Sequence, residues 1–203
     1  MVLLFLKSLA IGLAVALPMG PIGVLIVRRT LVLGLARGLE GGVGVAVADG
    51  LHAAMAAFGV TAVTALLAEQ QTWFQAIGGA ALLWIGVAIM RKPAPVQDGG
   101  KRGDVGGGFG VMFGLTLANP ATILSFAAIF ASLGPIADGG VASAIAMTLG
   151  VFLGSLGWWV VLTGAVGALR THITASVMLW LSRGAGALIV CFGLAALAAA
   201  VWA

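Results

Sequence analysis

Long apolar runs separated by short polar segments dominate the chain, and this pattern predicts its fold class. An α-helix needs about 20 apolar residues to cross a bilayer, and six runs reach or approach that length. They lie at about 3–27, 41–67, 73–90, 109–133, 141–168 and 184–203. The sequence therefore predicts an all-α integral membrane protein with six transmembrane helices.

Composition supports this class. Hydrophobic residues make up 62% of the 203 residues and charged residues only 8%, with a mean hydropathy of +1.19. Soluble domains are about half apolar and about one quarter charged. The 32 glycines fit close helix packing, because small residues let helix backbones approach one another in lipid.

Two prolines interrupt the first apolar run. Pro18 and Pro21 stand in the stretch AVALPMGPIGVLIV, with glycines at Gly20 and Gly23. Proline has no N–H group, so Pro21 cannot donate a hydrogen bond to the carbonyl of Leu17. A carbonyl without a partner is costly in a membrane unless something else binds it. We therefore expect a broken helix whose open backbone groups take part in function.

The same segment resembles a secretory signal in one respect. Ala14-Val15-Ala16 is a small-residue triplet that follows an apolar run. A signal peptide carries its positive charge ahead of the apolar run, whereas Lys7 lies inside it. We therefore expect an uncleaved first helix.

The basic residues are distributed unevenly between the loops. Loops one, three and five carry nine of the ten, namely Arg28, Arg29, Arg37, Arg91, Lys92, Lys101, Arg102, Arg170 and Arg183. Because cytoplasmic loops are enriched in Lys and Arg, these loops are predicted to face the cytoplasm and both termini the outside of a bacterial-type inner membrane. These charges flank apolar spans and form no patch of their own. We therefore expect no nucleic-acid partner, although the pI is near 10.3.

The third loop divides the chain into two similar halves. Residues 91–108 are polar and rich in Gly and Pro, which is typical of a linker. Three spans lie on each side, so the second half enters the membrane from the opposite face, as in an inverted repeat. We expect a single membrane domain over 1–203, with repeat 1 at about 1–90, a cytoplasmic linker at about 91–108 and repeat 2 at about 109–203. In an alignment of the second span of each half, Asp49 corresponds to Ser155.

Several other features are interpreted as packing or anchoring. The segment 170–183 mixes polar and apolar residues and is predicted to be an interfacial piece that leads into the last span. Glycines at four-residue spacing predict close helix contacts or a dimer face, at Gly106, Gly110 and Gly114 and at Gly150 and Gly154. Four tryptophans are predicted interfacial anchors: Trp73, Trp158, Trp159 and Trp202.

Asp49 is the acidic residue that lies furthest from any loop. An Asp near the centre of a membrane helix costs roughly 2.5 to 3.5 kcal/mol, so Asp49 should face the bundle interior or a hydrated cavity. His52 follows three residues later on the same helical face, within reach of Asp49. Such a pair can bind and release protons, and Asp49 can also hold a cationic group. The alternatives are a polar contact between helices for Asp49 and ordinary packing for His52.

A second break occurs at ANPATILS, residues 118–125. Pro120 cannot donate to the carbonyl of Thr116, whereas the amide of Asn119 can both donate and accept hydrogen bonds. Thr122 and Ser125 add hydroxyl groups. Broken helices present N-termini that favour carboxylates and open carbonyls that favour cations, and a zwitterionic amino acid needs both. The alternative is a simple proline kink in which Thr122 and Ser125 bond to their own helical turn.

The sequence contains no sign of an enzyme. Cys191 is the single cysteine, and two histidines without a second cysteine make no closed zinc set. No Gly-rich phosphate loop, catalytic triad or paired active-site carboxylate occurs. We expect no catalytic residues, no cofactor and no metal.

Two stretches resemble a known family. PMGPIGVLIVRRTLVLGLARGLEGGVGVAVADGLHAAMAAFG resembles the first repeat of the lysine exporter (LysE) family of amino-acid exporters, which has a PGP-type motif, a basic loop and an Asp-x-x-His element, here Asp49 to His52. GLTLANPATILSFAAIFASLG resembles the family's fourth span, with its Asn-Pro motif at Asn119-Pro120. The chain departs from the family pattern at Met19, which intervenes in the first motif, and at Ile22, where many members have a polar residue.

The resemblance implies export of amino acids or related small metabolites across the inner membrane, in exchange for protons. The predicted pathway residues are Pro18, Gly20, Pro21, Asp49, His52, Asn119, Pro120, Thr122 and Ser125. The expected partners are the small-molecule substrate, protons, the lipid bilayer and a second copy in a homodimer. Two alternatives stay open: a divalent-cation exporter, for which one Asp and one His are few ligands unless two protomers contribute, and a non-transporting membrane scaffold or assembly protein.

Overall fold

The computed structural model describes residues 1–17, 20–57, 71–91, 107–119, 122–123, 125–126, 140–169 and 175–202. Within these ranges the chain forms seven helices. They are α1 (Val2–Ala16), α2 (Pro21–Leu33), α3 (Leu35–Ala57), α5 (Gln71–Arg91), α6 (Phe109–Leu117), α8 (Gly140–Leu169) and α9 (Ala175–Trp202). The described residues contain no strand.

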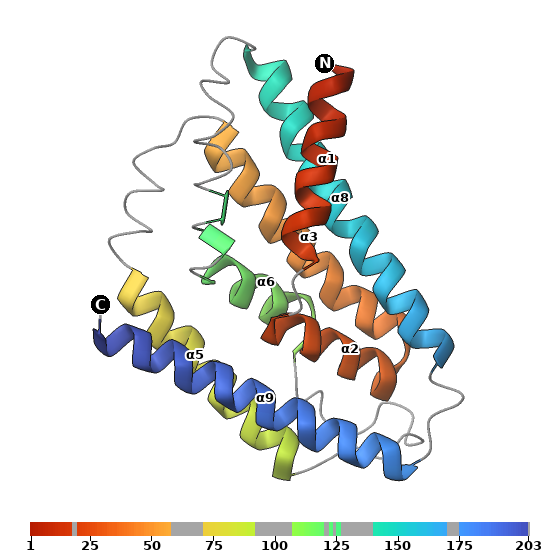
Figure 1. Cartoon of the computed structure of the whole chain (residues 1–203). Helices are drawn as coiled ribbons and strands as arrows, with labels where there is room; N and C mark the ends of the chain where they lie inside the picture. Colours follow the sequence, from red (N-terminus) through yellow and green to blue (C-terminus); the bar gives the residue numbers. More distant parts are fainter. Residues whose placement is uncertain are drawn as a thin grey trace.

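The helices form two groups that α2 connects. The helices α1 and α3 pack along α8, and α5 pairs with α9 along most of its length (Figure 1). The short helix α6 packs against α3. Because α2 contacts both α8 and α9 as well as α3, the break between α1 and α2 lies where the two groups meet.

Glycines allow the closest helix contacts. Gly150 and Gly154 of α8 lie against the backbone of α1, where a Cβ atom at Gly154 would overlap the carbonyl of Leu9. This confirms the close contact predicted for that pair. At Gly110 and Gly114 of α6, by contrast, an added Cβ would meet no atom within 4 Å, and Gly106 lies outside the described residues.

The apolar helices agree with a membrane protein. Among the residues that the structure describes, two segments are long and apolar enough to span a bilayer on their own, Gly140–Leu169 and Arg183–Val201, and α1 and α2 meet the criterion as one bent pair. The two helices of that pair are bent by 81° at the predicted break. Six spans in a 3+3 inverted repeat remain a prediction.

The segment before the last span differs from its prediction. Residues 175–183 belong to α9, which continues without interruption to Trp202. The described part of this segment therefore is not a separate interfacial piece. Its polar residues end no helix, because the segment contains no proline and a long helix can place polar and apolar side chains on different faces.

Two arginines that were assigned to the first loop are buried within α2. Arg28 and Arg29 expose only 6% and 3% of their surface. Arg29 donates hydrogen bonds to the carbonyl oxygens of Arg37 and Gly107, the latter at 2.8 Å, and forms a 3.1 Å ion pair with Glu40. Burial of a guanidinium group is tolerated when its donors are satisfied in this way. The loop assignment was therefore wrong for these two residues, which lie on α2, and for Arg37, which lies on α3.

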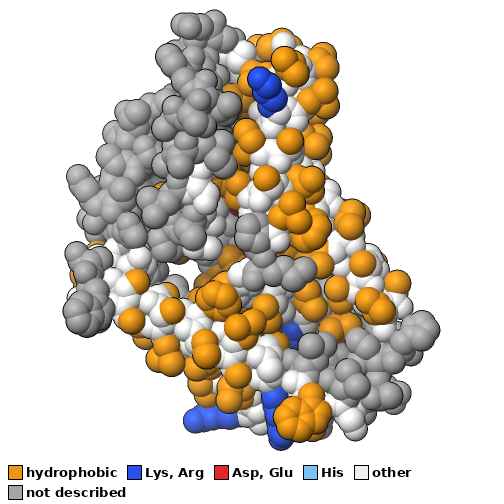
Figure 2. All heavy atoms as spheres, viewed as in Figure 1, with side chains coloured by type: hydrophobic (Ala, Val, Ile, Leu, Met, Phe, Trp, Pro, Cys, Tyr) orange, Lys and Arg blue, Asp and Glu red, His pale blue; other side chains and the backbone are white. Residues whose placement is uncertain are grey.

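Much of the outer surface is apolar. Hydrophobic side chains cover much of the visible face of the helices, and Lys and Arg side chains lie toward the two ends of the molecule (Figure 2). Large exposed apolar residues include Leu3, Trp84, Val161 and Trp180, which are 66%, 72%, 64% and 72% exposed. Exposed apolar surface of this extent fits a molecule surrounded by lipid.

Candidate functional site

Two adjoining cavities lie at the breaks in the helices. The larger has a volume of about 410 Å³ and the smaller about 70 Å³. Six residues line both cavities: Val15, Gly20, Pro21, Ile22, Asn119 and Thr122. The end of α1, the start of α2 and the described residues that follow α6 thus form a wall common to the two spaces.

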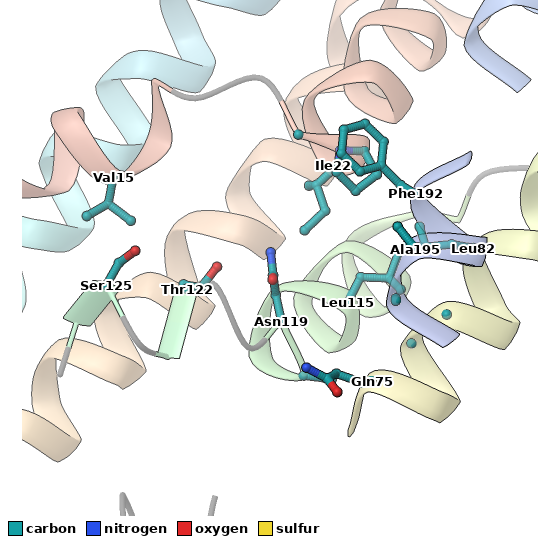
Figure 3. A pocket seen from close by; sticks show the side chains of 16 residues that line it. Val15, Ile22, Gln75, Leu82, Leu115, Asn119, Thr122, Ser125, Phe192 and Ala195 are labelled. Carbon is teal, nitrogen blue, oxygen red and sulfur yellow. The ribbon is translucent and has the colours of Figure 1, made fainter. Parts of the chain in front are cut away.

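The larger cavity is mostly apolar. Its apolar side chains include Val15, Ile22, Leu82, Leu115 and Phe192, which come from five different helices or their ends (Figure 3). Its polar side chains are neutral: Gln75, Asn119, Thr122 and Ser125. The described residues place no charged side chain in the wall of this cavity.

The N-terminus of α2 opens onto both cavities. Gly20 is the N-cap residue, Pro21 occupies the first turn, and no side chain caps the helix. The first amides of a helix have no partner within the helix, and the helix dipole makes this end partly positive. Proline is well suited to the first position because it has no amide to satisfy. The amides of Ile22 and Gly23, residues that line the smaller cavity, are therefore suited to binding an anionic group.

The second break is formed by the end of α6. The amides of Ala118 and Asn119 donate to the carbonyls of Gly114 and Thr116, at 2.9 and 3.1 Å, so the helix closes within one turn. The carbonyl of Asn119 then accepts a hydrogen bond from the amide of Ile123 at 3.1 Å. Asn119 thus stands between two helical turns and contributes to both cavities. Pro120 and Pro18 lie outside the described residues.

Asp49 lies in the wall of the smaller cavity. It is only 2% exposed, and its Oδ2 accepts a 2.7 Å hydrogen bond from the hydroxyl of Ser155. Asp49 comes from α3 and Ser155 from α8, so the bond connects two helices. Within the described part of the chain Asp49 makes no ion pair, which leaves its carboxylate as a single acidic group beside the cavity.

His52, unlike Asp49, does not line the cavities. Its ring stacks on Phe126, with ring centres 5.6 Å apart and planes inclined by 11°. The residue is 3% exposed, and neither ring nitrogen has a hydrogen-bond partner among the described residues. His52 lines neither of the two cavities. The hydrogen bond of Asp49 is therefore made with Ser155 and not with His52.

Most of the predicted pathway residues that can be described gather at this site. Those that line one or both cavities are Gly20, Pro21, Asp49, Asn119, Thr122 and Ser125. Among the described residues, no three His, Cys, Asp or Glu side chains lie close enough to hold a metal ion.

The sequence analysis missed or misassigned several residues that line the cavities, among them three with polar groups. Gln75 lines the larger cavity and Thr116 the smaller one, and neither belongs to a motif. Trp159 also lines the smaller cavity and is 4% exposed, so its prediction as an interfacial anchor was wrong. The pair Trp158-Trp159 gives no signal in sequence that one of the two is buried. The structural reason is that Trp159 packs over Gly42 of α3, where no side chain blocks it.

Comparison with protein families identifies the chain. A family model described as LysE type translocator matches residues 13–199. The protein belongs to the LysE type translocator family. The match to this family includes both helix breaks and Asp49, so the resemblance inferred from the two motifs is confirmed. Corresponding comparisons with curated proteins and with solved structures give no match.

Membership in the LysE family gives the protein a general role. Translocators of this type are membrane transporters, so the chain is a membrane transporter for amino acids or similar small molecules. This agrees with the predicted class of transporter and with the apolar helices of the structure.

Proposed function

We propose that the protein exports amino acids or related small zwitterionic metabolites across the inner membrane by proton antiport. The observation that carries the proposal is the position of Asp49, the one buried acid among the described residues, beside two cavities that share residues on either side of both helix breaks. A zwitterion requires an anionic group for its ammonium and hydrogen-bond donors for its carboxylate. The site has Asp49 for the first and the partly positive N-terminus of α2 for the second.

The smaller cavity suits the charged end of an amino acid. The carboxylate of Asp49 can accept hydrogen bonds from an ammonium group. The amides of the first turn of α2, which no side chain caps, can donate to a carboxylate. The indole Nε1 of Trp159 is buried without a hydrogen-bond partner among the described residues and can act as a further donor. In this arrangement the side chain of the substrate extends into the larger, mostly apolar cavity.

Coupling to protons follows from competition at one group. The Asp49 carboxylate can bind either a proton or the substrate ammonium, and binding of one weakens binding of the other. When the substrate is released on the outer side, the carboxylate binds a proton. That proton is released on the inner side when the next substrate binds. Such exchange requires no second acidic residue.

The proposed topology has six spans in a 3+3 inverted repeat. In this proposal loops one, three and five face the cytoplasm and both termini face outward. Seven of the nine basic residues assigned to these loops support it, once the buried Arg28 and Arg29 are set aside. The protein functions as a homodimer in this proposal. Cysteine labelling from either side of the membrane at Val2, which is 74% exposed, and at positions in the 91–108 loop tests the topology.

The function is tested by transport in proteoliposomes. Cells with and without the protein are first compared for amino acids released into the medium. The amino acid that accumulates is then loaded into liposomes that contain the purified protein, and its release is followed under an imposed pH gradient. We expect release to depend on the gradient in the wild type and to be lost in Asp49→Asn.

A matched control distinguishes a loss of folding from a loss of proton coupling. Ser143→Ala removes a buried polar group from α8, outside both cavities, and should preserve transport. Unchanged gradient-driven release in a well-folded Asp49→Asn protein contradicts the coupling role of Asp49. If the wild type releases no amino acid under any gradient, the proposed function is wrong.

A further inference from the structure

An ion pair near the end of α2 joins three parts of the chain. Arg29 donates a 2.8 Å hydrogen bond to the carbonyl of Gly107 and forms a 3.1 Å ion pair with Glu40 of α3. Gly108, the N-cap residue of α6, lies against the same ion pair. An added Cβ there would meet Oε1 of Glu40 at 2.5 Å and Nη2 of Arg29 at 3.5 Å. These four residues, which we call the latch, hold the start of α6 to α2 and α3.

A layer of buried apolar side chains adjoins the latch. Its members meet at Gly41 of α3, where an added Cβ would lie 3.2 Å from Met112 of α6 and 3.5 Å from Ile26 of α2. The same Cβ would lie 3.9 Å from the side chain of Arg29, so the layer touches the latch. Ile26 and Met112 are both 0% exposed. A solute therefore cannot pass between α2, α3 and α6 at this level while α6 keeps its position.

The latch and the apolar layer lie outside the cavities, at the other ends of the two helices that border the breaks. None of their residues lines either cavity. Helix α2 begins at the cavities with Pro21 and reaches Arg29 about two turns, or roughly 12 Å, further along. Helix α6 runs from Gly108 at the latch toward Asn119 at the cavities. The same two short helices thus connect the latch with the site.

Helix α6 has the features of a movable element. It is nine residues long and packs mainly on α3 (Figure 1). It is preceded by Gly107, whose φ of 72° is a conformation that glycine adopts readily, and it closes at Asn119. Its contact surface on α3 includes Gly41 and Gly44, which have no side chains to interlock with it. Residues at the ends of an element can absorb the backbone change that such a movement needs.

We infer that the latch and the apolar layer form the cytoplasmic gate of the transporter, which opens when α6 moves away from α2 and α3. The inference rests on the proposed function, because an exporter takes up its substrate from the cytoplasm and the end of α2 is assigned to that side. The ion pair stabilises the closed state, since loss of Glu40 would take the anionic partner from Arg29, which is only 3% exposed.

Labelling of a cysteine within the apolar layer measures how often the gate opens. The exposed Cys191 is replaced by alanine, and Ile26→Cys then places a single thiol in the layer. A membrane-impermeant maleimide is applied to inside-out vesicles without substrate. Labelling should be slow because Ile26 is fully buried. Glu40→Gln should raise the labelling rate about tenfold or more, because a weakened latch increases the population of the open state.

Ile189→Cys is the matched control for this labelling. Ile189 is also 0% exposed, but it lies on α9, which pairs with α5 away from α6. Glu40→Gln should change its labelling little. A comparable rise at Ile26→Cys and Ile189→Cys would mean that the substitution loosens the whole protein. An unchanged rate at Ile26→Cys would mean that the ion pair does not hold the gate. Either result overturns the inference.

A disulfide between α3 and α6 tests the movement itself. Gly41→Cys and Met112→Cys bring two thiols together, because a Cβ at position 41 lies 3.2 Å from Cγ of Met112. In the Cys191→Ala protein, oxidation of this pair should lower amino-acid export about tenfold or more, and reduction should restore it. Leu35→Cys with Gly167→Cys is the matched control. Their Cβ atoms lie 3.5 Å apart and join α3 to α8, so oxidation of this pair should preserve export.

The possible results separate the gate from the proposed function. Full export by the oxidised Gly41→Cys/Met112→Cys protein, or equal inhibition by the control disulfide, overturns the gate while export by the wild type stands. Failure of the thiols at positions 41 and 112 to join contradicts the contact on which the gate depends. A wild type that exports no amino acid contradicts the proposed function, and the labelling rates, which require no substrate, then decide whether the latch opens.

Discussion

The hydroxyl of Ser155 donates a 2.7 Å hydrogen bond to Oδ2 of Asp49. These two residues occupy corresponding positions when the second span of each half of the sequence is aligned. The structure thus places an acidic residue of the first half against a hydroxyl of the second half, in the part of α3 and α8 that lies beside the smaller cavity. A contact between equivalent positions is what a two-fold related pair of helices produces at its axis.

Loss of the Ser155 hydroxyl should weaken both stability and transport. Asp49 has no other hydrogen-bond partner among the described residues, and a hydrogen bond to a charged group contributes about 1.5–3 kcal/mol. We expect Ser155→Ala to lower the thermal unfolding midpoint in detergent and to reduce, but not abolish, gradient-driven export. Unfolding is followed by fluorescence and export in proteoliposomes.

A double-mutant cycle isolates this contact. If the bond between Ser155 and Asp49 carries the effect, Ser155→Ala should cost much less stability in the Asp49→Asn background than in the wild type. Equal costs in both backgrounds would mean that Ser155 acts through packing alone.

The sequence predicted where the candidate site lies better than it predicted which residues line it. Prolines and an isolated acid have direct physical consequences in a membrane, because unpaired carbonyls and buried charges are costly wherever they occur. This is why the sequence alone could predict one site that contains Gly20, Pro21, Asp49 and Asn119, and these four residues line the two adjoining cavities. The helix bounds from 140 to 169 and from 71 to 91 also follow closely from apolar length.

The missed features depend on tertiary contacts. The burial of Trp159 requires Gly42 on another helix, and the burial of Arg29 requires Glu40 and the Gly107 carbonyl. Gln75 is notable only because its carboxamide oxygen has no partner among the described residues, which is a property of its surroundings and not of the residue type.

His52 is predicted to act through packing. Its ring stacks on Phe126 and lies outside both cavities, so His52→Ala should leave a void and destabilise the protein by about 2–4 kcal/mol. His52→Phe keeps an aromatic ring and should retain export with the same pH profile as the wild type. Export measured at several pH values checks this, and a shifted profile in His52→Phe would return His52 to the proton pathway.

The Arg29–Glu40 pair should make stability depend on acid pH. Glu40 lies directly before the predicted span 41–67, and the hydrogen bond from Arg37 is the main cause that lowers its pKa below the ordinary value of 4.5. Burial acts in the opposite direction, and the hydrogen bond and positive charge of Arg29 lower the pKa further. The folded state therefore stabilises the ionised form of Glu40 relative to the unfolded state. The resulting stability is complete above pH 4.5 and is lost as the pH falls through the lowered pKa.

Thermal unfolding at different pH values tests this contribution. At neutral pH, Glu40→Gln should be less stable than the wild type, because Arg29 is 3% exposed and loses its anionic partner. The difference should shrink as the pH falls below 4.5, whereas from about pH 5 to 8 it should stay constant. Arg37→Gln is the milder comparison, since the side chain of Arg37 is 65% exposed. A difference between wild type and Glu40→Gln that does not change with pH would contradict the assignment.

Gly154 should be the position on α8 that is most sensitive to a single added methyl group. A Cβ there would overlap the carbonyl oxygen of Leu9 in α1, and neither backbone can move without displacing its whole helix. We expect Gly154→Ala to destabilise the protein by about 1–3 kcal/mol, measured as a lower unfolding midpoint in detergent. Gly157→Ala is the matched control on the same helix, where an added Cβ meets no atom within 4 Å. Because alanine favours a helix over glycine by about 1 kcal/mol, Gly157→Ala should be neutral or slightly stabilising. If both substitutions have the same effect, the close approach of α1 and α8 at Gly154 is not what holds these helices together.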